Sequence, residues 1–300
     1  MRRNIILGHL FTISVIVRWG LTFISSKILL RDFTPVEILF DRFLLATAAM
    51  AVLAPRALKF VSWKVELYAA IVGFSGITLY FIFENNALIY SNSSNVSLIV
   101  STAPLFVGLI NWLLLKDNKP DLNFFLGFLV AMTGIAFLSY GTLSINLNPI
   151  GDILAIGSAA VWGIYSLFVV KLLRMEISSF TITLKSFFYS VLLTLPLMVD
   201  SYSIKPDCLL KPINIINFVF LAIIASSLSF FLWSKSVEYI GSINTNLYLY
   251  GIPVVTTVGA IFILDEQITV YTIIGMVMAI GGLVISQFHL KKIKKQESKI

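Results

Sequence analysis

Apolar runs long enough to cross a membrane follow one another along almost the whole chain, and they constrain the fold more than any other feature. Ten such runs lie between Ile5 and Leu290, with short polar segments between them. They cover residues 5–30, 35–54, 66–88, 93–115, 121–140, 149–170, 178–199, 213–234, 243–264 and 270–290. A hydrocarbon layer roughly 30 Å thick needs about 20 apolar residues per helical crossing, so each run is long enough to span it once.

The composition excludes a soluble protein. Of the 300 residues, 58% are hydrophobic and only 12% are charged, which is far more apolar than one soluble core requires. The runs do not alternate between apolar and polar residues, and in lipid a helix satisfies its own backbone hydrogen bonds. The sequence therefore predicts an all-α membrane protein with ten transmembrane helices.

The distribution of positive charge predicts the orientation. If the segments between runs are assigned to alternate sides, one side holds 15 Lys and Arg residues and the other holds 3. Positively charged segments stay in the cytoplasm, so we expect both termini to be cytoplasmic. The net charge of +7 comes largely from the basic tail, residues 291–300, which suits anionic lipid headgroups. We therefore expect a lipid bilayer and no nucleic acid as partner.

The two parts of the chain share landmarks in the same order, which indicates an internal duplication. The pairs are Trp19-Gly20 with Trp162-Gly163, Lys27 with Lys171, Tyr90 with Tyr239, Pro104 with Pro253, and Gly127 and Gly134 with Gly275 and Gly282. The tyrosine and proline pairs have the same offset of 149 residues. We therefore predict two five-helix repeats over residues 1–140 and 149–290, followed by the cytoplasmic tail.

An odd number of spans in each repeat makes the two copies enter the membrane from opposite sides. Inverted repeats of this kind are typical of secondary transporters, in which two similar bundles open a central site to one side and then to the other. The predicted fold is therefore a bundle of two inverted five-helix repeats that works by alternating access.

At this level of detail the chain resembles the EamA family of the drug/metabolite transporter superfamily. The resemblance rests on RWGLTFISSKIL followed by PVEILFDRFLLA, on GDILAIGSAAVWGIYSLFVVK, and on the paired stretches ALIYSNSSNVSLIVSTAPLF and SVEYIGSINTNLYLYGIPVV. It implies ten helices, of which the first four of each half line a central cavity and the fifth packs outside. Members move small metabolites and often export amino acids. Arg18 departs from the family, where an apolar residue more commonly precedes Trp-Gly.

Arg18 is a charge near the middle of the first apolar run. Placing an arginine at that depth costs about 2.5 to 3.5 kcal/mol unless another group offsets it. Two interpretations are open: an internal ion pair with Asp41 or Glu84, or a cavity arginine whose planar fork receives a carboxylate of the substrate. Asp41 and Glu84 are themselves candidates for proton coupling.

Further candidates come from polar and aromatic residues that the helical spacing or the repeat brings together. Ser97, Ser101 and Pro104 fall on one face of their run, and the 149 offset matches them with Asn246, Tyr250 and Pro253. The candidates for substrate binding besides Arg18 are Trp19, Thr22, Tyr80, Ser97, Ser101, Trp162, Tyr165, Asn246 and Tyr250. Close helix packing and an aromatic belt at the membrane surface are the alternative roles. Pro104 and Pro253 are candidate hinges.

The remaining charges within the runs have simpler explanations. Lys27 and Lys185 lie near the ends of their runs, so we expect both side chains to reach the headgroups. Arg42 matches an arginine common in the family, and pairing with its neighbour Asp41 is its simplest role. The glycines Gly127, Gly134, Gly275 and Gly282 indicate packing surfaces, within the chain or between two copies, so monomer and homodimer both stay open.

The sequence contains no phosphate-binding G-x-x-x-x-G-K-[ST] motif, and its two histidines, His9 and His289, lie near opposite ends. We therefore expect no enzyme, no catalytic residue, no metal and no cofactor. The predicted function is a secondary transporter in the cell membrane, the inner membrane of a bacterium, that moves a small organic metabolite. An amino acid or related carboxylate is the expected substrate and export the expected direction. The alternatives are a transporter or exchanger of a nucleotide-like or cationic metabolite, and a structural or sensory membrane protein without flux.

Overall fold

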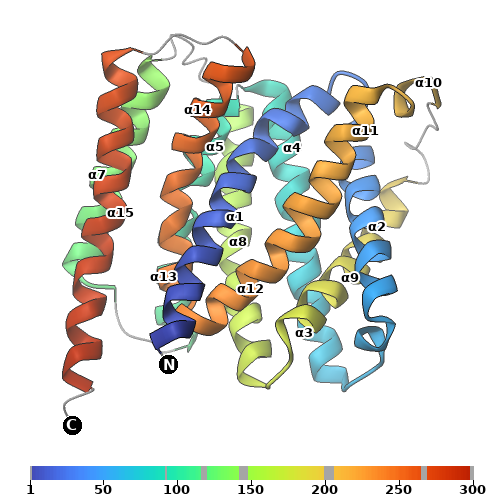
Figure 1. Ribbon diagram of the computed structural model, residues 1–300, viewed down its shortest axis with the longest axis horizontal. Helices are drawn as coiled ribbons and strands as arrows, with labels where there is room; N and C mark the ends of the chain where they lie inside the picture. The colour runs from blue at the N-terminus through green and yellow to red at the C-terminus, as the bar shows by residue number, and fades with distance from the viewer. Residues whose placement is uncertain are drawn as a thin grey trace.

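The structure is a computed structural model that describes residues 2–91, 93–115, 120–141, 148–198, 206–264 and 269–297. Within these ranges the chain forms helices joined by short turns, and it contains no β-strand (Figure 1). The all-helical prediction is therefore confirmed for the described residues. Of the predicted basic tail, residues 298–300 lie outside them, and so do the side chains of 291–297.

The helices of the first part of the chain lie over the first five predicted spans. They are α1 (Arg2–Leu29), α2 (Pro35–Leu53), η1 (Pro55–Leu58), α3 (Trp63–Gly73), η2 (Phe74–Leu79), α4 (Tyr80–Tyr90), α5 (Ser93–Val100), α6 (Ala103–Ile110), η3 (Asn111–Leu115) and α7 (Leu122–Gly141). Among these, α3, η2 and α4 follow one another without a break, and so do α6 and η3.

The helices of the second part, apart from the short α10, lie over the other five predicted spans. They are α8 (Pro149–Arg174), α9 (Ser179–Met198), α10 (Pro206–Leu209), α11 (Pro212–Val219), η4 (Phe220–Leu228), α12 (Ser229–Ile240), α13 (Ser242–Leu247), η5 (Tyr248–Gly251), α14 (Ile252–Leu264) and α15 (Val270–Glu297). The elements α11, η4 and α12 form one continuous stretch.

Six of the described helical stretches are both long and apolar enough to cross a membrane. They are Arg3–Leu29, Trp63–Tyr90, Val96–Leu115, Pro149–Arg174, Ser179–Met198 and Pro212–Ile240. The count of ten crossings therefore stays a prediction. In Figure 1, α1 begins and α15 ends at the same end of the bundle, which is the arrangement that an even number of crossings produces.

Two π-helical segments occur at corresponding places in the two parts of the chain. The segment η2 ends at Leu79, and η4 ends at Leu228, 149 residues later. Each is followed directly by a helix, α4 from Tyr80 and α12 from Ser229. Such segments are rare and often lie at functional sites. Their positions match the offset that the tyrosine and proline pairs indicate.

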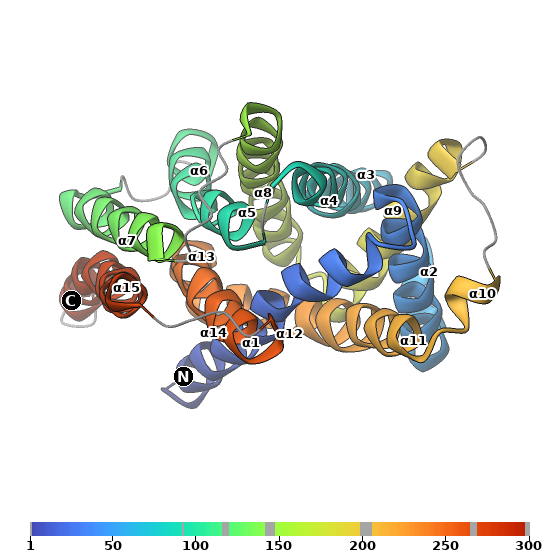
Figure 2. The ribbon, with the colours of Figure 1, turned by 90° about the horizontal axis from the view of Figure 1, so that it is seen from above.

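The helices α7 and α15 pack side by side at one edge of the bundle, away from α2, α9 and α11 (Figure 2). Glycines make this contact close, because a Cβ atom at Gly127 would lie 2.6 Å from the Gly282 carbonyl oxygen. A Cβ at Gly134 would lie 2.8 Å from the Gly275 carbonyl oxygen. The predicted glycine surfaces therefore pack against each other within one chain.

The two predicted hinge prolines lie next to interruptions of the α-helix. Pro104 is in the first turn of α6, directly after the turn at Ser101 and Thr102 that ends α5. Pro253 is in the first turn of α14, after the 3-10 segment η5. In a first turn a proline removes no helical hydrogen bond, so the interruption precedes each proline and is not a kink within a continuous helix. Their role as hinges stays a prediction.

The structure places the two lysines that we expect to reach the headgroups in different surroundings. The Lys185 ammonium is buried, lies 2.6 Å from Oε1 of Glu66 and donates to the Lys59 carbonyl at 2.9 Å. The prediction for Lys185 is therefore wrong, because a buried carboxylate on α3 holds the charge inside the bundle. Lys27 donates to the carbonyls of Leu88 and Ser91, at the end of α4, and its reach to the headgroups stays a prediction.

Candidate functional site

A pocket lies at the centre of the bundle, where helices of both repeats meet. Its empty space, counted to its open mouth, is about 430 Å³. It is lined by Trp19, Thr22, Phe23, Arg42, Tyr80, Phe81, Glu84, Val100, Ala103, Trp162, Phe230, Leu249 and Ile252. Most of these side chains are apolar or aromatic and a few are polar, which is the usual composition of a site for a small molecule.

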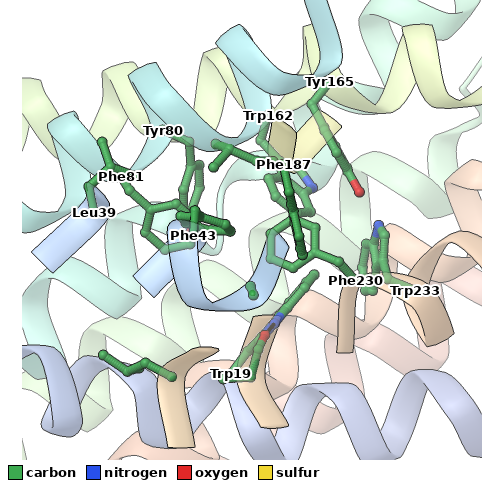
Figure 3. Close-up of a cluster of buried hydrophobic side chains, with 14 of the residues drawn as sticks. Trp19, Leu39, Phe43, Tyr80, Phe81, Trp162, Tyr165, Phe187, Phe230 and Trp233 are labelled. Atoms are coloured by element: carbon green, nitrogen blue, oxygen red, sulfur yellow. Dashed lines mark hydrogen bonds between the residues drawn. The ribbon is translucent and has the colours of Figure 1, made fainter. Parts of the chain in front are cut away.

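Aromatic rings form one wall of this pocket (Figure 3). The rings of Trp19 and Trp162 meet edge to face with centroids 5.4 Å apart, and Trp19 also contacts Phe230 at 5.1 Å. The Tyr80 ring lies 5.2 Å from Trp162, on the side toward Phe81. Distances of 4.5 to 7 Å are typical of favourable aromatic contacts, so the wall is well packed.

Hydrogen bonds fix the orientation of both tryptophans. The Trp19 indole donates to the Ala225 carbonyl at 2.9 Å, next to the end of the π-helical segment η4. The Trp162 indole donates to Oδ1 of Asn246 at 2.8 Å. Asn246 in turn donates to the Ser242 carbonyl at 2.9 Å and to the Ser166 hydroxyl at 3.2 Å. Asn246 therefore positions Trp162 and does not itself line the pocket.

Arg42 brings a positive charge to the pocket. The side chain is 2% exposed, and its Nε atom donates to the Ser226 hydroxyl at 2.7 Å. The guanidinium lies over the Phe81 ring, 4.3 Å from its centroid, and contacts Phe43 at 5.1 Å. Among the described residues its Nη2 atom has no hydrogen-bond partner. A buried unsatisfied donor is costly, so this nitrogen is available to a ligand.

Glu84 brings a negative charge to the same pocket. Its side chain is 1% exposed, and in the described part of the chain its Oε1 atom accepts no hydrogen bond. The Tyr80 hydroxyl is close enough to interact with the Glu84 carboxylate, and the Arg42 charge acts on it from α2. Arg42 donates its hydrogen bond to Ser226, and the opposite charge that acts on it is that of Glu84, not that of its neighbour Asp41 as expected.

Local structure explains how Arg42 reaches the pocket. The helix α2 starts with a capping box, in which the Thr34 hydroxyl accepts from the Glu37 amide and the Glu37 carboxylate accepts from the Thr34 amide. This reciprocal pair and Pro35 in the first turn fix the start of α2. Arg42 follows seven residues after Pro35, which is about two helical turns and so on the same face.

The pocket is narrow in this conformation. The cavity volume available to water is about 20 Å³, which is room for about one water molecule. The aromatic side chains must therefore separate before a metabolite can occupy the pocket. The described residues contain no cluster of three or more His, Cys, Asp or Glu side chains that could hold a metal ion.

The structure brings together five of the residues that the sequence singled out. Trp19, Thr22, Tyr80 and Trp162, which were candidates for substrate binding, line the pocket, and so does Glu84, a candidate for proton coupling. These residues come from α1, α4 and α8, so the helices expected to line the cavity do contribute to it.

Arg18 lies elsewhere. Its guanidinium donates to the Ser14 carbonyl at 2.9 Å, to the Ser14 hydroxyl at 2.6 Å and to the Ser229 hydroxyl at 3.2 Å. Two of these three bonds stay within its own helix, and Arg18 is not among the residues that line the pocket. The open question of its partner is answered by serines, not by Asp41 or Glu84.

The other candidates lie outside the lining. Ser101 donates to the Ser97 carbonyl at 2.6 Å, and neither serine reaches the pocket. Tyr165 stacks on Trp162 with centroids 4.4 Å apart, on the side away from Tyr80 (Figure 3). Tyr250 packs in a separate cluster with Phe124, and Asp41 lies beside Arg42 on α2 outside the lining.

Sequence reasoning missed Arg42 and most of the apolar lining. One signal could have found part of it, because the 149 offset pairs Phe81 with Phe230, Val100 with Leu249 and Ala103 with Ile252. All six of these residues line the pocket. The candidates from the fourth span lie on its polar face, whereas its neighbouring apolar face lines the pocket.

Comparison with known proteins agrees with this architecture. The sequence model of the EamA-like transporter family matches residues 6–140 and 149–288. An uncharacterized transporter of Archaeoglobus fulgidus is 27% identical over 280 residues, which cover 92% of this chain and 95% of that protein. The uncharacterized transporter YyaM of Bacillus subtilis is 27% identical and covers 88% of each chain.

A solved crystal structure has the same fold. It superposes with a TM-score of 0.73 over 93% of this chain and 96% of the other, at 17% sequence identity. The apolar helices, the transporter relatives and the family match over both parts of the sequence together describe a multi-pass membrane protein. The chain therefore belongs to the EamA-like transporter family.

Proposed function

We propose that the protein is a secondary transporter of the cell membrane that exports an amino acid or a related carboxylate by alternating access. The observation that carries this proposal is the free Nη2 atom of Arg42, which is buried in a central pocket between the two repeats. An arginine presents a planar fork of donors that matches a carboxylate, and the bond between them is charge-assisted.

The shape and composition of the pocket support an amphipathic substrate. The rings of Trp19, Trp162 and Phe230 offer an apolar surface beside the guanidinium. A metabolite with a carboxylate at one end and an apolar body at the other would place each part against matching side chains. We therefore assign binding of the substrate carboxylate to Arg42 and not to Arg18, because Arg18 already donates to three serine oxygens.

Alternating access is supported by two features. The matched interruptions before Pro104 and Pro253 give each repeat a place where the helix can bend. The pocket has room for about one water molecule in this conformation, so loading requires movement of the surrounding helices. The proposal includes ten crossings, two inverted repeats and cytoplasmic termini, as the distribution of positive charge predicts.

A counterflow assay with the purified protein in proteoliposomes tests the proposal. Vesicles loaded with a mixture of unlabelled amino acids and organic acids should take up the labelled form of the substrate faster than vesicles without protein. Arg42→Gln should abolish this uptake for a carboxylate substrate. Failure to observe counterflow of any amino acid or organic anion by folded protein would refute the proposal.

Of the nucleotide-like or cationic metabolites that are the alternative, a cation is the second candidate substrate, and one observation favours it. Glu84 has a free oxygen in the same pocket, and aromatic rings stabilise cations. Adding amines without a carboxylate to the counterflow panel separates the two candidates. A membrane protein without flux is less well supported, because a closed bundle would need no pocket with two buried, partly unsatisfied charges.

A further inference from the structure

We infer that Glu84 binds either the ammonium group of a zwitterionic substrate or a proton, but not both, so that the protein exchanges one substrate molecule for one proton. The inference rests on the proposed function, since it concerns how the same pocket is coupled. It begins from two charged side chains, Arg42 and Glu84, that line one pocket and leave one polar atom each without a partner among the described residues.

The two unsatisfied atoms are complementary to two different groups. Nη2 of Arg42 is a donor and fits a carboxylate, whereas Oε1 of Glu84 is an acceptor and fits an ammonium group. No direct ion pair joins Arg42 and Glu84 in the described structure, because the guanidinium is held by Ser226 and by the Phe81 ring. A ligand that carries both charges can therefore enter between them.

The groups around Glu84 leave the pocket nearly free of other charges. From α4 itself Tyr80 faces Glu84, and from α2 Arg42 does. Of the other elements packed against α4, α1 supplies Trp19, Thr22 and Phe23 to the pocket, α5 supplies Val100 and α8 supplies Trp162. Lys27 of α1 lies at the end of α4, where it donates to the Leu88 and Ser91 carbonyls. Arg42 and Glu84 are thus the only charged side chains that line the described pocket.

Charge balance then links the substrate to the proton. The empty pocket holds one positive and one negative side chain, so its net charge is zero. A bound zwitterion keeps the net charge at zero, with its carboxylate at Arg42 and its ammonium at Glu84. A proton on Glu84 removes the negative charge and makes one oxygen a donor, so the neutral carboxyl no longer attracts the ammonium group. Proton and zwitterion therefore compete for Glu84, although they share no other contact.

This competition would make export drive proton entry in the opposite direction. The outward-moving pocket carries the substrate and an ionised Glu84. Exchange requires that the pocket return only with Glu84 protonated, because without an ammonium group or a proton this carboxylate is a buried charge with an unsatisfied oxygen. The returning pocket then carries one net positive charge. One charge moves inward per cycle, so a proton gradient or an inside-negative potential favours export. Carboxyl groups within a membrane commonly serve as proton carriers of this kind.

The test is a titration of substrate affinity against pH with the full-length protein in detergent. The ligands are free amino acids that pass the counterflow assay and the matching carboxylic acids that lack the amino group. Between about pH 4.5 and pH 7.5 both α-groups of an amino acid stay charged, so changes in affinity report the protein. We expect the apparent Kd for the amino acid to rise about tenfold per pH unit below the titration midpoint of Glu84. The amine-free acid should show no such rise.

Two variants separate the proposed role from a general effect. Glu84→Gln should bind the amino acid with an affinity independent of pH and should lose the preference for the amino group. Binding of the amine-free acid should persist and shows that this variant is folded. Glu238→Gln is the control, because Glu238 pairs with Lys235 outside the pocket, and it should titrate like the wild type.

Three results would overturn the inference. The first is wild-type affinity for the amino acid that does not change with pH, and the second is a pH dependence that survives in Glu84→Gln. In both cases binding itself stands, so transport of a carboxylate would stand as well. The third is the absence of binding by any amino acid or acid at every pH, which would overturn the proposed function together with this coupling.

Discussion

The two repeats contribute unequally to the pocket that they share. The first repeat supplies every polar side chain of the lining, namely Thr22, Arg42, Tyr80 and Glu84. At the corresponding positions the second repeat carries Tyr165, Ser186, Ser229 and Trp233, none of which lines the pocket. Arg42 and Ser186 correspond because each follows the first residue of its helix, α2 or α9, by seven residues.

Both repeats, in contrast, supply aromatic residues to the centre of the bundle. Trp19 contacts its counterpart Trp162 at 5.4 Å, and Phe43 contacts its counterpart Phe187 at 5.0 Å. Residues related by a twofold axis can touch each other only near that axis, so these rings mark the centre of the predicted repeat. The duplicated scaffold thus brings the rings together, while substitutions in the first repeat supply the polar groups that can recognise a ligand.

The largest effect on stability is expected at Lys185, a second charge that differs between the repeats, because it occupies the position that Asp41 has in the first repeat. Lys185→Met should destabilise the protein by about 3–5 kcal/mol, because it leaves the Glu66 carboxylate buried without its ammonium partner. Thermal unfolding in detergent measures the loss. The double variant Lys185→Met with Glu66→Gln should recover most of it, whereas Lys235→Met, in a more exposed pair, should change little. Equal melting of the single and double variants would contradict the explanation.

The next largest effect is expected from Arg42, the positive charge that the second repeat lacks at the matching position. Arg42→Gln should weaken carboxylate binding by about 100-fold, because it removes a buried charge-assisted bond. Arg18→Gln is the matched control, since Arg18 lies within the membrane span but outside the lining, and it should change the Kd less than about twofold. Binding measurements on both variants compare them. The reverse order of effects would assign the substrate carboxylate to Arg18.

A smaller effect tests whether a polar residue of the second repeat contributes to recognition. Ser226→Ala removes the hydroxyl that holds Nε of Arg42 at 2.7 Å. A hydrogen bond to a charged group contributes about 1.5 kcal/mol, so carboxylate affinity should fall about tenfold. The neighbouring Ser227, which donates to the Ala222 carbonyl, gives the control variant Ser227→Ala. An unchanged Kd for Ser226→Ala would confine the polar part of recognition to the first repeat.

The smallest effect is expected at the surface contact between the repeats. Lys211 and Asn214 each donate to Asp32 at 2.8 Å, and these bonds lower the pKa of the Asp32 carboxyl below its usual value of 3.8. A lowered pKa in the folded state gives stability that is present above pH 3.8 and is lost as the pH falls through the folded value. The melting temperature of the wild type should therefore fall slightly more in acid than that of Asp32→Asn. Parallel melting curves across this range would show that the contact contributes nothing.

The helical ranges could be predicted from the sequence because hydropathy in lipid reports the elements almost directly. Trp19, Thr22, Tyr80, Trp162 and Glu84 were also found, since deep polar and aromatic residues mark protected faces. Which protected face looks into the pocket could not be predicted. A serine is sheltered from lipid as well by a neighbouring helix as by a cavity, and Ser97 and Ser101 are sheltered in the first way.

The two arginines show the same limit more clearly. Arg18 is a strong candidate from the sequence because it lies deep in the first span. Its guanidinium, however, donates hydrogen bonds to Ser14, one turn earlier in the same helix. Arg42 lies nearer to the end of its span, and the adjacent Asp41 offered a simple pairing. Its contact with Ser226 joins residues 184 positions apart and depends on how the two repeats pack. Patterns within one helix do not contain that information.

The small free volume of the pocket has a consequence for the passage of protons through the protein. Water molecules in single file conduct protons, and such a file must extend from one aqueous phase to the other. Space for about one water molecule beside the tryptophan and phenylalanine rings is too small for such a file within this pocket. We therefore expect that an empty copy in this conformation conducts no protons through the pocket.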